Sequence, residues 1–242
     1  MGRMTLDQLL AELKTVFGTQ LRTVVLYGSA VAGEHIPNRS NYNVLVLVDS
    51  LPLDRLLAKA PGAQAWTAAG NPPPLLLTVS EWRSSSDIFP MEYADILERH
   101  RVLYGDAPFE GLSVSPTDLR LQVENQAMGK LLQLRQGALA AGGDGTRQAA
   151  LLAASLSAIM VVFRAVTRLH GESPPTDYEA LTRLVAEHAG FDAAPFLQVV
   201  RHVRGSTPLG PGEAGSVLGA YLQGMERLVA HVNRMPIAGS GD

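Results

Sequence analysis

The chain has 242 residues, which is enough for one large domain or two small ones. Its 46% hydrophobic and 18% charged residues are typical of a globular protein, and a net charge of −3 offers no bulk attraction for nucleic acid. The absence of cysteine excludes disulfides, thiolate metal sites and cysteine nucleophiles.

The first half of the chain alternates predicted helices and strands. Apolar spacing every three or four residues predicts helices, and short β-branched and leucine-rich runs predict buried strands. In chain order we expect a helix at 5–17, strands at 24–27 and 44–48, a helix at 53–60 ended by Pro61, a strand at 75–79 and a last strand at 101–105. Further helices are expected to begin at 30–34 and 80–82, with a loop at 37–40. Residues 91–98 fit either a strand or a helix, and we favour a strand.

The second half has the pattern of an antiparallel helical bundle. Helices are predicted from residue 116 up to Gly142 and at 146–170, 177–189, 192–203 and 213–235, with short connections. The most apolar run, residues 149–163, is too short to span a bilayer comfortably and is expected to be a central bundle helix. Residues 237–242 are expected to be a disordered tail. The domains are therefore predicted at 1–112 and 113–236.

The most informative motif lies between the first two predicted strands. The first strand leads into Gly28-Ser29, a turn whose amides and hydroxyl could donate to phosphate oxygens. Asn41 and Asn43 lie two residues apart at the start of the second strand. We expect their side chains on one face, with Cα atoms roughly 6.5–7 Å apart. Two carboxylates so placed could hold two Mg²⁺ ions about 3.5–4 Å apart, whereas carboxamides are poor Mg²⁺ ligands.

This pattern resembles the motif of the nucleotidyltransferase superfamily, which has a polymerase-β-like fold and includes the antibiotic nucleotidyltransferases. That motif is an apolar residue, Gly and Gly or Ser, followed after a gap by Asp-apolar-Asp/Glu-apolar. Residues 27–29 supply the first part, 30–40 the gap and 41–44 the second part, and Ser40 also matches many members. Both acids of the motif are asparagines in this chain.

The resemblance implies a fold and a set of binding residues. The fold would be α+β, a mixed sheet with flanking helices followed by an all-α bundle. Gly28, Ser29 and Ser40 would bind a nucleotide, while Asn41 and Asn43 would mark degenerate metal positions that hold no metal.

A third carboxylate on a neighbouring strand is usual in this family. The predicted strand at 75–79 has none, and Thr78 is its only polar residue. Asp95 is the best substitute if residues 91–98 form a strand, and Glu92 is the next. A solvated or ion-paired carboxylate is the alternative interpretation of both.

We therefore expect a catalytically degenerate nucleotidyltransferase that binds ATP, another NTP or a small molecule in the cleft between the two halves. No cofactor is expected, and Mg²⁺ would be needed only by an active enzyme. One alternative is an active enzyme that transfers a nucleotide to a hydroxyl group by means of a displaced carboxylate such as Asp95. Another is an interaction or oligomerisation module, and a homodimer is left open. We expect a cytoplasmic location, no membrane partner and no nucleic-acid partner.

The remaining charged residues give weaker signals. Arg164 and His170 have the spacing of a helical ribonuclease motif, but six residues on a helix lie on different faces, so we expect only cations near a helix end. The charged run 98–101 is expected to be a solvated turn, with the lining of a nucleotide or acceptor cleft as the alternative. The other histidines show no metal-ligand spacing and are expected to be scattered: His35, His188, His202 and His231.

Overall fold

The structure is a computed structural model that describes residues 3–31 and 42–236. The chain divides into two compact units, Met1–Val114 and Ser115–Asp242. Three predictions fall on residues outside these ranges. They are the site residues Ser40 and Asn41, the part of the expected helix beyond residue 31, and the tail at 237–242.

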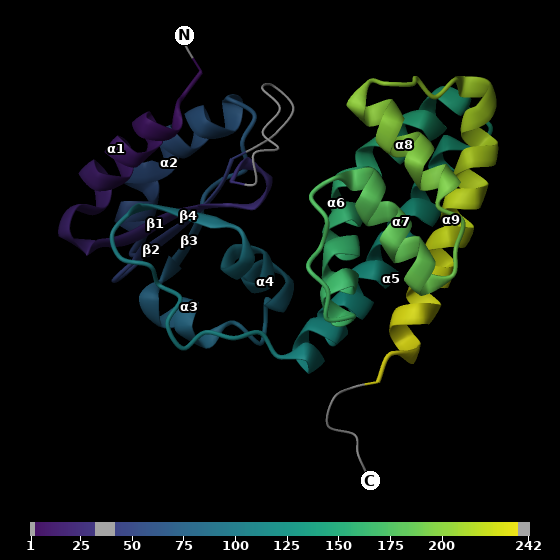
Figure 1. The fold of residues 1–242 in the computed structure, drawn as a ribbon. Helices are drawn as coiled ribbons and strands as arrows, with labels where there is room; N and C mark the ends of the chain where they lie inside the picture. The colour runs from purple at the N-terminus through teal and green to yellow at the C-terminus, as the bar shows by residue number, and fades with distance from the viewer. Residues whose placement is uncertain (1–2, 32–41, 237–242) are drawn as a thin grey trace. The chain divides into compact units, whose positions relative to one another are not determined.

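The first unit is built on a mixed sheet. Its described strands are β1 (Leu21–Tyr27), β2 (Asn43–Val48), β3 (Leu75–Thr78) and β4 (His100–Tyr104). Its helices are α1 (Leu6–Phe17), α2 (Leu53–Ala68), α3 (Val79–Ser84) and α4 (Pro90–Glu98). The strand order is β3-β2-β1-β4, as Figure 1 shows. β1 runs antiparallel to β2 and β4, whereas β2 and β3 are parallel.

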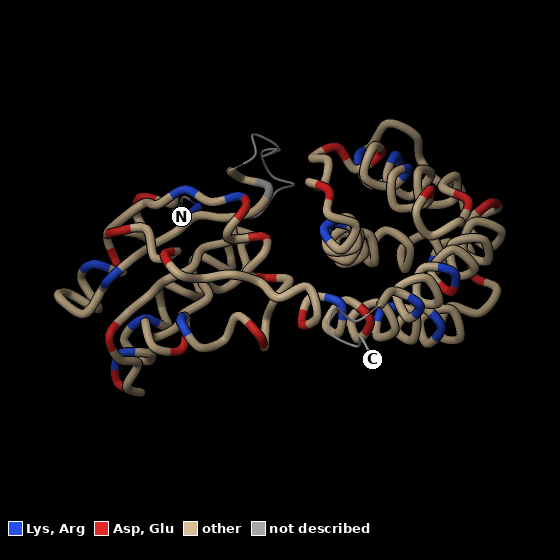
Figure 2. The backbone as a smooth tube through the Cα atoms, turned by 60° about the horizontal axis from the view of Figure 1, so that its bottom comes forward, with Lys and Arg blue, Asp and Glu red and all other residues tan. Residues whose placement is uncertain are grey.

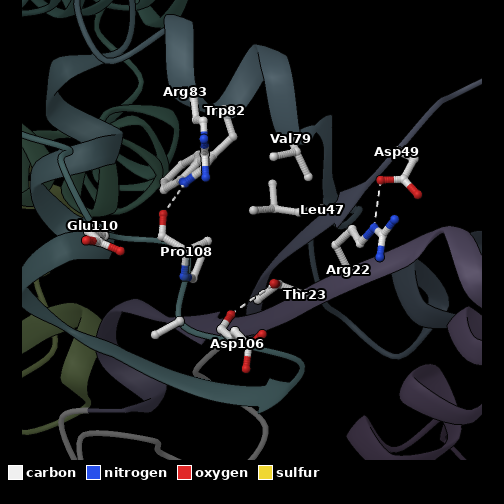
Figure 3. Close-up of a pocket in the computed structure, with 11 residues that line it drawn as sticks. Arg22, Thr23, Leu47, Asp49, Val79, Trp82, Arg83, Asp106, Pro108 and Glu110 are labelled. Carbon is white, nitrogen blue, oxygen red and sulfur yellow. Dashed lines mark hydrogen bonds and ion pairs between the residues drawn. The ribbon is translucent and has the colours of Figure 1, made fainter.

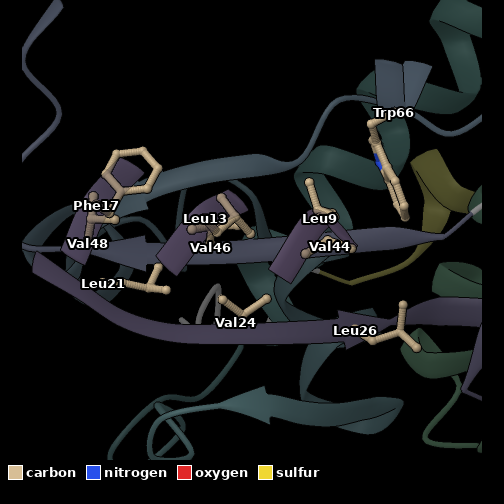
Figure 4. Packing of buried hydrophobic residues seen from close by; sticks show 10 residues of the cluster. All are labelled: Leu9, Leu13, Phe17, Leu21, Val24, Leu26, Val44, Val46, Val48 and Trp66. Carbon is tan, nitrogen blue, oxygen red and sulfur yellow. The ribbon is translucent and has the colours of Figure 1, made fainter. Parts of the chain in front are cut away.

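Alternation along the strands gives the sheet two apolar faces, each covered by helices. On one face, side chains from β1 and β2 pack against α1 and against Trp66 of α2, as Figure 4 shows. On the other face, Val25, Leu45 and Leu47 pack against Trp82 of α3 and against α4. The sheet core is therefore closed on both sides, and polar chemistry is confined to its ends.

Two sequence predictions in this unit are wrong. Residues 91–98 lie in helix α4, which begins with Pro90 at a position where the missing N–H costs no hydrogen bond. Its buried residues include Met91, Tyr93 and Ile96. Met91 and Tyr93 are two residues apart, which also fits the alternation of a strand. Helix α2 does not end at Pro61 but continues to Ala68. Its last turns bury Trp66, whose Nε1 donates to the carbonyl of Pro72 at 2.9 Å.

The second unit is a helical bundle. Its helices are α5 (Pro116–Ala141), α6 (Gly145–Leu169), α7 (Tyr178–Ala189), α8 (Ala194–Arg204) and α9 (Pro211–Arg234). α6 packs against α5, α7, α8 and α9, and its buried residues form much of the bundle core. By length and hydropathy alone, α6 is the one described helix that could cross a membrane, and half of its most apolar stretch is buried inside the bundle. The predicted α+β class, with a mixed sheet followed by a helical bundle, is confirmed.

Charged residues of both signs are interspersed along the chain of each unit, as Figure 2 shows. Two of the described charged residues are buried, Lys59 and Arg120. Lys59 of α2 has 3% of its surface exposed, and its Nζ lies 2.6 Å from Oε2 of Glu12 on α1. A buried ammonium group needs such a partner because its desolvation is otherwise uncompensated. This ion pair therefore ties α1 to α2.

We predict that Glu12→Ala lowers the free energy of unfolding of the first unit by about 1–3 kcal/mol, because Lys59 would be left buried without its acceptor. Urea titration followed by tryptophan fluorescence measures this, since both tryptophans, Trp66 and Trp82, lie in this unit. The control is Glu12→Ala combined with Lys59→Met, which removes both partners and should recover most of the loss. Equal losses in the single and double variants would contradict a stabilising role for the pair.

Candidate functional site

The candidate site lies at the end of the sheet where β1 reaches Gly28. Tyr27, the last residue of β1, is paired with Asn43 of β2 on one side and His100 of β4 on the other. Residues paired directly across strands share a face of the sheet. Tyr27, Asn43 and His100 therefore form a row on the face that α3 and α4 cover.

Gly28 begins a short 3₁₀ helix, Gly28–Ala30, and has a φ of +79°, a conformation that strongly favours glycine. A methyl group placed on its Cα would lie 3.1 Å from Nδ2 of Asn43, so the carboxamide packs directly over the turn. The Gly28 N–H donates to the carbonyl of Arg99 at 3.0 Å. This amide is therefore committed within the protein, and any phosphate contact falls to the following amides, those of Ser29 and Ala30.

Two carboxylates on α4 act on this row. Burial raises the pKa of Tyr27 to about 12, and the negative charges of Glu92 and Asp95 raise it further in the same direction. Glu92 and Asp95 are three residues apart and so lie on one side of α4. The two acids predicted as substitutes therefore lie on helix α4 and not on the strand on which the prediction depended. Their negative charges act on Tyr27, the cross-strand partner of Asn43.

His100 completes the row on the other side of Tyr27. Its Nδ1 lies 2.8 Å from the carbonyl of Ile96, so that nitrogen carries a proton and donates, which leaves Nε2 as the acceptor of the neutral ring. The ring packs against Phe109 with centroids 4.0 Å apart. The run 98–101 is therefore not the solvated turn that the sequence predicts, because His100 and Arg101 belong to β4.

The predicted site residues are thus described in part. The structure brings Gly28 and Asn43 together at one end of the sheet, and Glu92 and Asp95 of α4 act electrostatically on Tyr27 there. The backbone of Ser29 lies in the turn. Ser40 and Asn41 fall outside the described residues, so the structure describes only Asn43 of the two predicted metal positions. Within the described ranges, no group of three or more histidine, aspartate or glutamate side chains is arranged to hold a metal ion.

A cavity of about 300 Å³ in the first unit lies at the opposite end of the sheet. Figure 3 shows Arg22 at the start of β1 and Asp49 beyond the end of β2, joined by an ion pair of 2.7 Å. Trp82 donates to the carbonyl of Pro108 at 2.8 Å in the same cavity. Gly28 is six residues along the chain from Arg22, which corresponds to roughly 20 Å of extended strand. The cavity is therefore distinct from the candidate site. Two of the charged residues that line it, Arg22 and Asp49, neutralise each other in the ion pair.

In the second unit, sequence reasoning missed a cluster of histidines. His188 and His231, expected to be scattered, lie together with His170, which was expected only as a cation near a helix end. His170 and His188 stack with centroids 3.8 Å apart, and His170 and His231 with centroids 5.2 Å apart. Each lies at or near the C-terminal end of its helix, α6, α7 or α9. That shared position is the one signal in the sequence that could have indicated the cluster.

No protein-family model matches the chain, and no curated protein matches it in sequence. Among solved structures, the chain is similar to spectinomycin adenyltransferase AAD(9) from Enterococcus faecialis, determined with ATP and spectinomycin, with a TM-score of 0.62 at 12% sequence identity. The match covers 94% of this chain and 98% of that one. This chain has a nucleotidyltransferase-like fold. At this identity the likeness shows the fold alone, so activity and ligands rest on the site residues.

We predict that Gly28→Ala destabilises the first unit by more than Gly70→Ala does. Both glycines have positive φ values, +79° and +93°, which cost an alanine about 1–2 kcal/mol. Only Gly28 also has a side chain against it, because a methyl group on Gly70 would meet nothing within 4 Å. Urea titrations of both variants give the difference, and adding Asn43→Ala should remove it. Equal losses for the two glycine variants would show that Asn43 does not press on the turn.

Proposed function

We propose that this protein binds a nucleoside triphosphate at the Gly28 turn and is impaired in metal-dependent nucleotidyl transfer. The observation that carries the proposal is the carboxamide of Asn43 packed over Gly28, at the position where the resembled family has a metal-binding acid. The ligand would lie at the end of the sheet formed by β1, β2 and β4.

The chemistry of the carboxamide supports an impaired enzyme. Two-metal phosphoryl transfer needs charged oxygen ligands that hold both cations and neutralise the developing charge. Asn43 offers one neutral oxygen, and the sequence has asparagine at position 41 as well. Such a site loses the negative charge that attracts Mg²⁺, and it also loses a repulsion toward a bare triphosphate.

The shared fold supports the nucleotide as ligand. The similar adenyltransferase was determined with ATP, and its likeness to this chain covers 94% of this chain and 98% of that one. The glycine turn is the element of this chain best suited to phosphate, because a positive φ lets the backbone approach closely and the next amides open a short helix.

We predict weak ATP binding that Mg²⁺ does not strengthen, with Kd on the order of 0.1–1 mM. Isothermal titration calorimetry with ATP, with and without Mg²⁺, measures this. The double variant Asn41→Asp/Asn43→Asp should gain a Mg²⁺-dependent increase in affinity, because two carboxylates would restore the metal ligands.

The matched control is Asp49→Asn, which changes a carboxylate at the opposite end of the sheet and should leave ATP binding unaltered. Tight, Mg²⁺-dependent binding by the natural chain would contradict an impaired metal site. No gain of Mg²⁺ dependence in the double aspartate variant would contradict the placement of the two asparagines as metal positions.

A second candidate, an active nucleotidyltransferase, is favoured by one observation. The negative charges of Glu92 and Asp95 both raise the pKa of Tyr27, the cross-strand partner of Asn43, which supports a role for these carboxylates at this end of the sheet. In an active enzyme these acids would hold Mg²⁺ in place of the missing pair. The acceptor would be a hydroxyl group that attacks the α-phosphate and releases pyrophosphate.

For this candidate we predict that Asp95→Asn lowers the rate of pyrophosphate release from ATP by at least about 100-fold, since it removes a metal ligand. The control is Asp87→Asn, because Asp87 acts on Tyr93 and not on Tyr27. A coupled pyrophosphate assay across candidate hydroxyl acceptors makes the measurement. Equal activity of the two variants would exclude Asp95 from catalysis.

A further inference from the structure

The histidine cluster of the second unit joins the ends of three helices. His170 caps the C-terminus of α6, His188 is next to the last residue of α7, and His231 lies in the last turn of α9. Nε2 of His170 and Nε2 of His231 are 3.0 Å apart, which is a hydrogen-bond distance between two ring nitrogens. His170 stacks on His188 with an angle of 6° between the ring planes.

Proton counting limits the charge that this arrangement can hold. A hydrogen bond between two Nε2 atoms needs one proton, so one ring donates and the other accepts. If His170 and His231 were both cations, two N–H groups would point at each other across 3.0 Å. The bond therefore exists only while at least one of these two rings is neutral.

The third ring adds a competing charge. Nε2 of His188 is buried and makes no hydrogen bond to any described residue, although Oε1 of Glu172 lies 2.8 Å away. A proton on His188 would form an ion pair with Glu172. The imidazolium so formed would stack on His170 at a centroid distance of 3.8 Å and repel a proton there.

We propose that His170, His188 and His231 form an acid-sensitive clamp that holds the ends of α6, α7 and α9 together and releases when the cluster takes up more than one proton. The charged groups that act on it are Glu172, which follows α6, and Arg234 on α9. The carboxylate of Glu172 favours a positive charge on His170, whereas the guanidinium of Arg234 disfavours one on His231. The cluster therefore binds one proton more readily than a second.

The direction of the pH dependence follows from linkage. Burial, and then the charge of His188, lower the pKa of His170, partly offset by Glu172. Burial, His170, Arg234 and His188 lower the pKa of His231. Unfolded histidine titrates at about 6.5, so below that pH the unfolded chain binds more protons than the folded one. The clamp is therefore fully stabilising above about pH 6.5. It weakens as the pH falls toward the lowered pKa values that His170 and His231 have in the folded chain.

A metal site is the competing interpretation of three histidines and a carboxylate, and the geometry disfavours it. Nε2 of His170 and Nε2 of His231 point at each other, and no set of three ligands among the described residues converges on one point. Zinc sites need such convergence, with nitrogen atoms about 2.0–2.1 Å from the ion.

The test compares thermal melts of the full chain at pH 7.5 and pH 5.0. Circular dichroism at the helical band reports mainly on the bundle, while tryptophan fluorescence reports on the first unit, which holds both tryptophans. We expect acid to lower the circular dichroism midpoint by about 3–6 °C beyond any change in the fluorescence midpoint. His170→Gln, which keeps hydrogen-bonding groups but does not titrate, should abolish that extra shift.

The control is His100→Gln in the first unit, which should leave the acid shift of the bundle unaltered. Equal acid shifts in the natural chain and His170→Gln would overturn the clamp. So would a rise in the circular dichroism midpoint on adding ZnCl₂ that His170→Gln abolishes, because the cluster would then be a metal site. If His170→Gln does not fold, NMR titration of the natural chain decides: His170 and His231 titrating at or above pH 6.5 would overturn the proposal, and titration below it would support it.

Discussion

The antiparallel pairing of β1 with both of its neighbours is the constraint on which the candidate site depends. This register sets Tyr27 beside Asn43 and His100 on the face covered by α4. The opposite face holds the register, because Val24 and Leu26 are buried against α1 and α2. A slip by one residue would exchange the two faces, so Val24 and Leu26 would have to pack against α3 and α4 instead of α1 and α2.

The sequence predicts those parts of the fold whose pattern is local. The apolar run of β2 and the caps of α1 and α7 are visible in composition and spacing, and Asp177 accepts from the Ala180 amide at 2.9 Å as a cap should. The helical state of α4 and the C-terminal end of α2 are not predicted, because tertiary burial decides them. The short apolar pattern of residues 91–98 does not distinguish a strand from a helix that buries Tyr93 and Ile96. Helix α2 continues past Pro61 because its last turns bury Trp66 in the core.

The candidate site shows the same division between local and tertiary information. The turn at Gly28 follows from the motif, since only glycine takes its positive φ easily. The commitment of the Gly28 amide to the carbonyl of Arg99 joins segments far apart in sequence, and no spacing rule predicts it. The approach of Asp95 from a helix has the same origin. The histidine clamp is a further case, because His170 and His231 meet only when α6 and α9 pack together.

The charge balance around Tyr27 separates the two functional candidates. With a pKa of about 12, the phenol stays protonated at physiological pH and can donate a hydrogen bond. Glu92 and Asp95, which help to keep it protonated, would repel a triphosphate, and the neutral Asn43 brings in no cation to offset that repulsion. A ligand bound without metal must therefore keep its phosphates on the Gly28 side of the row. An active enzyme must instead turn the same repulsion into attraction by placing Mg²⁺ between those carboxylates and the phosphates.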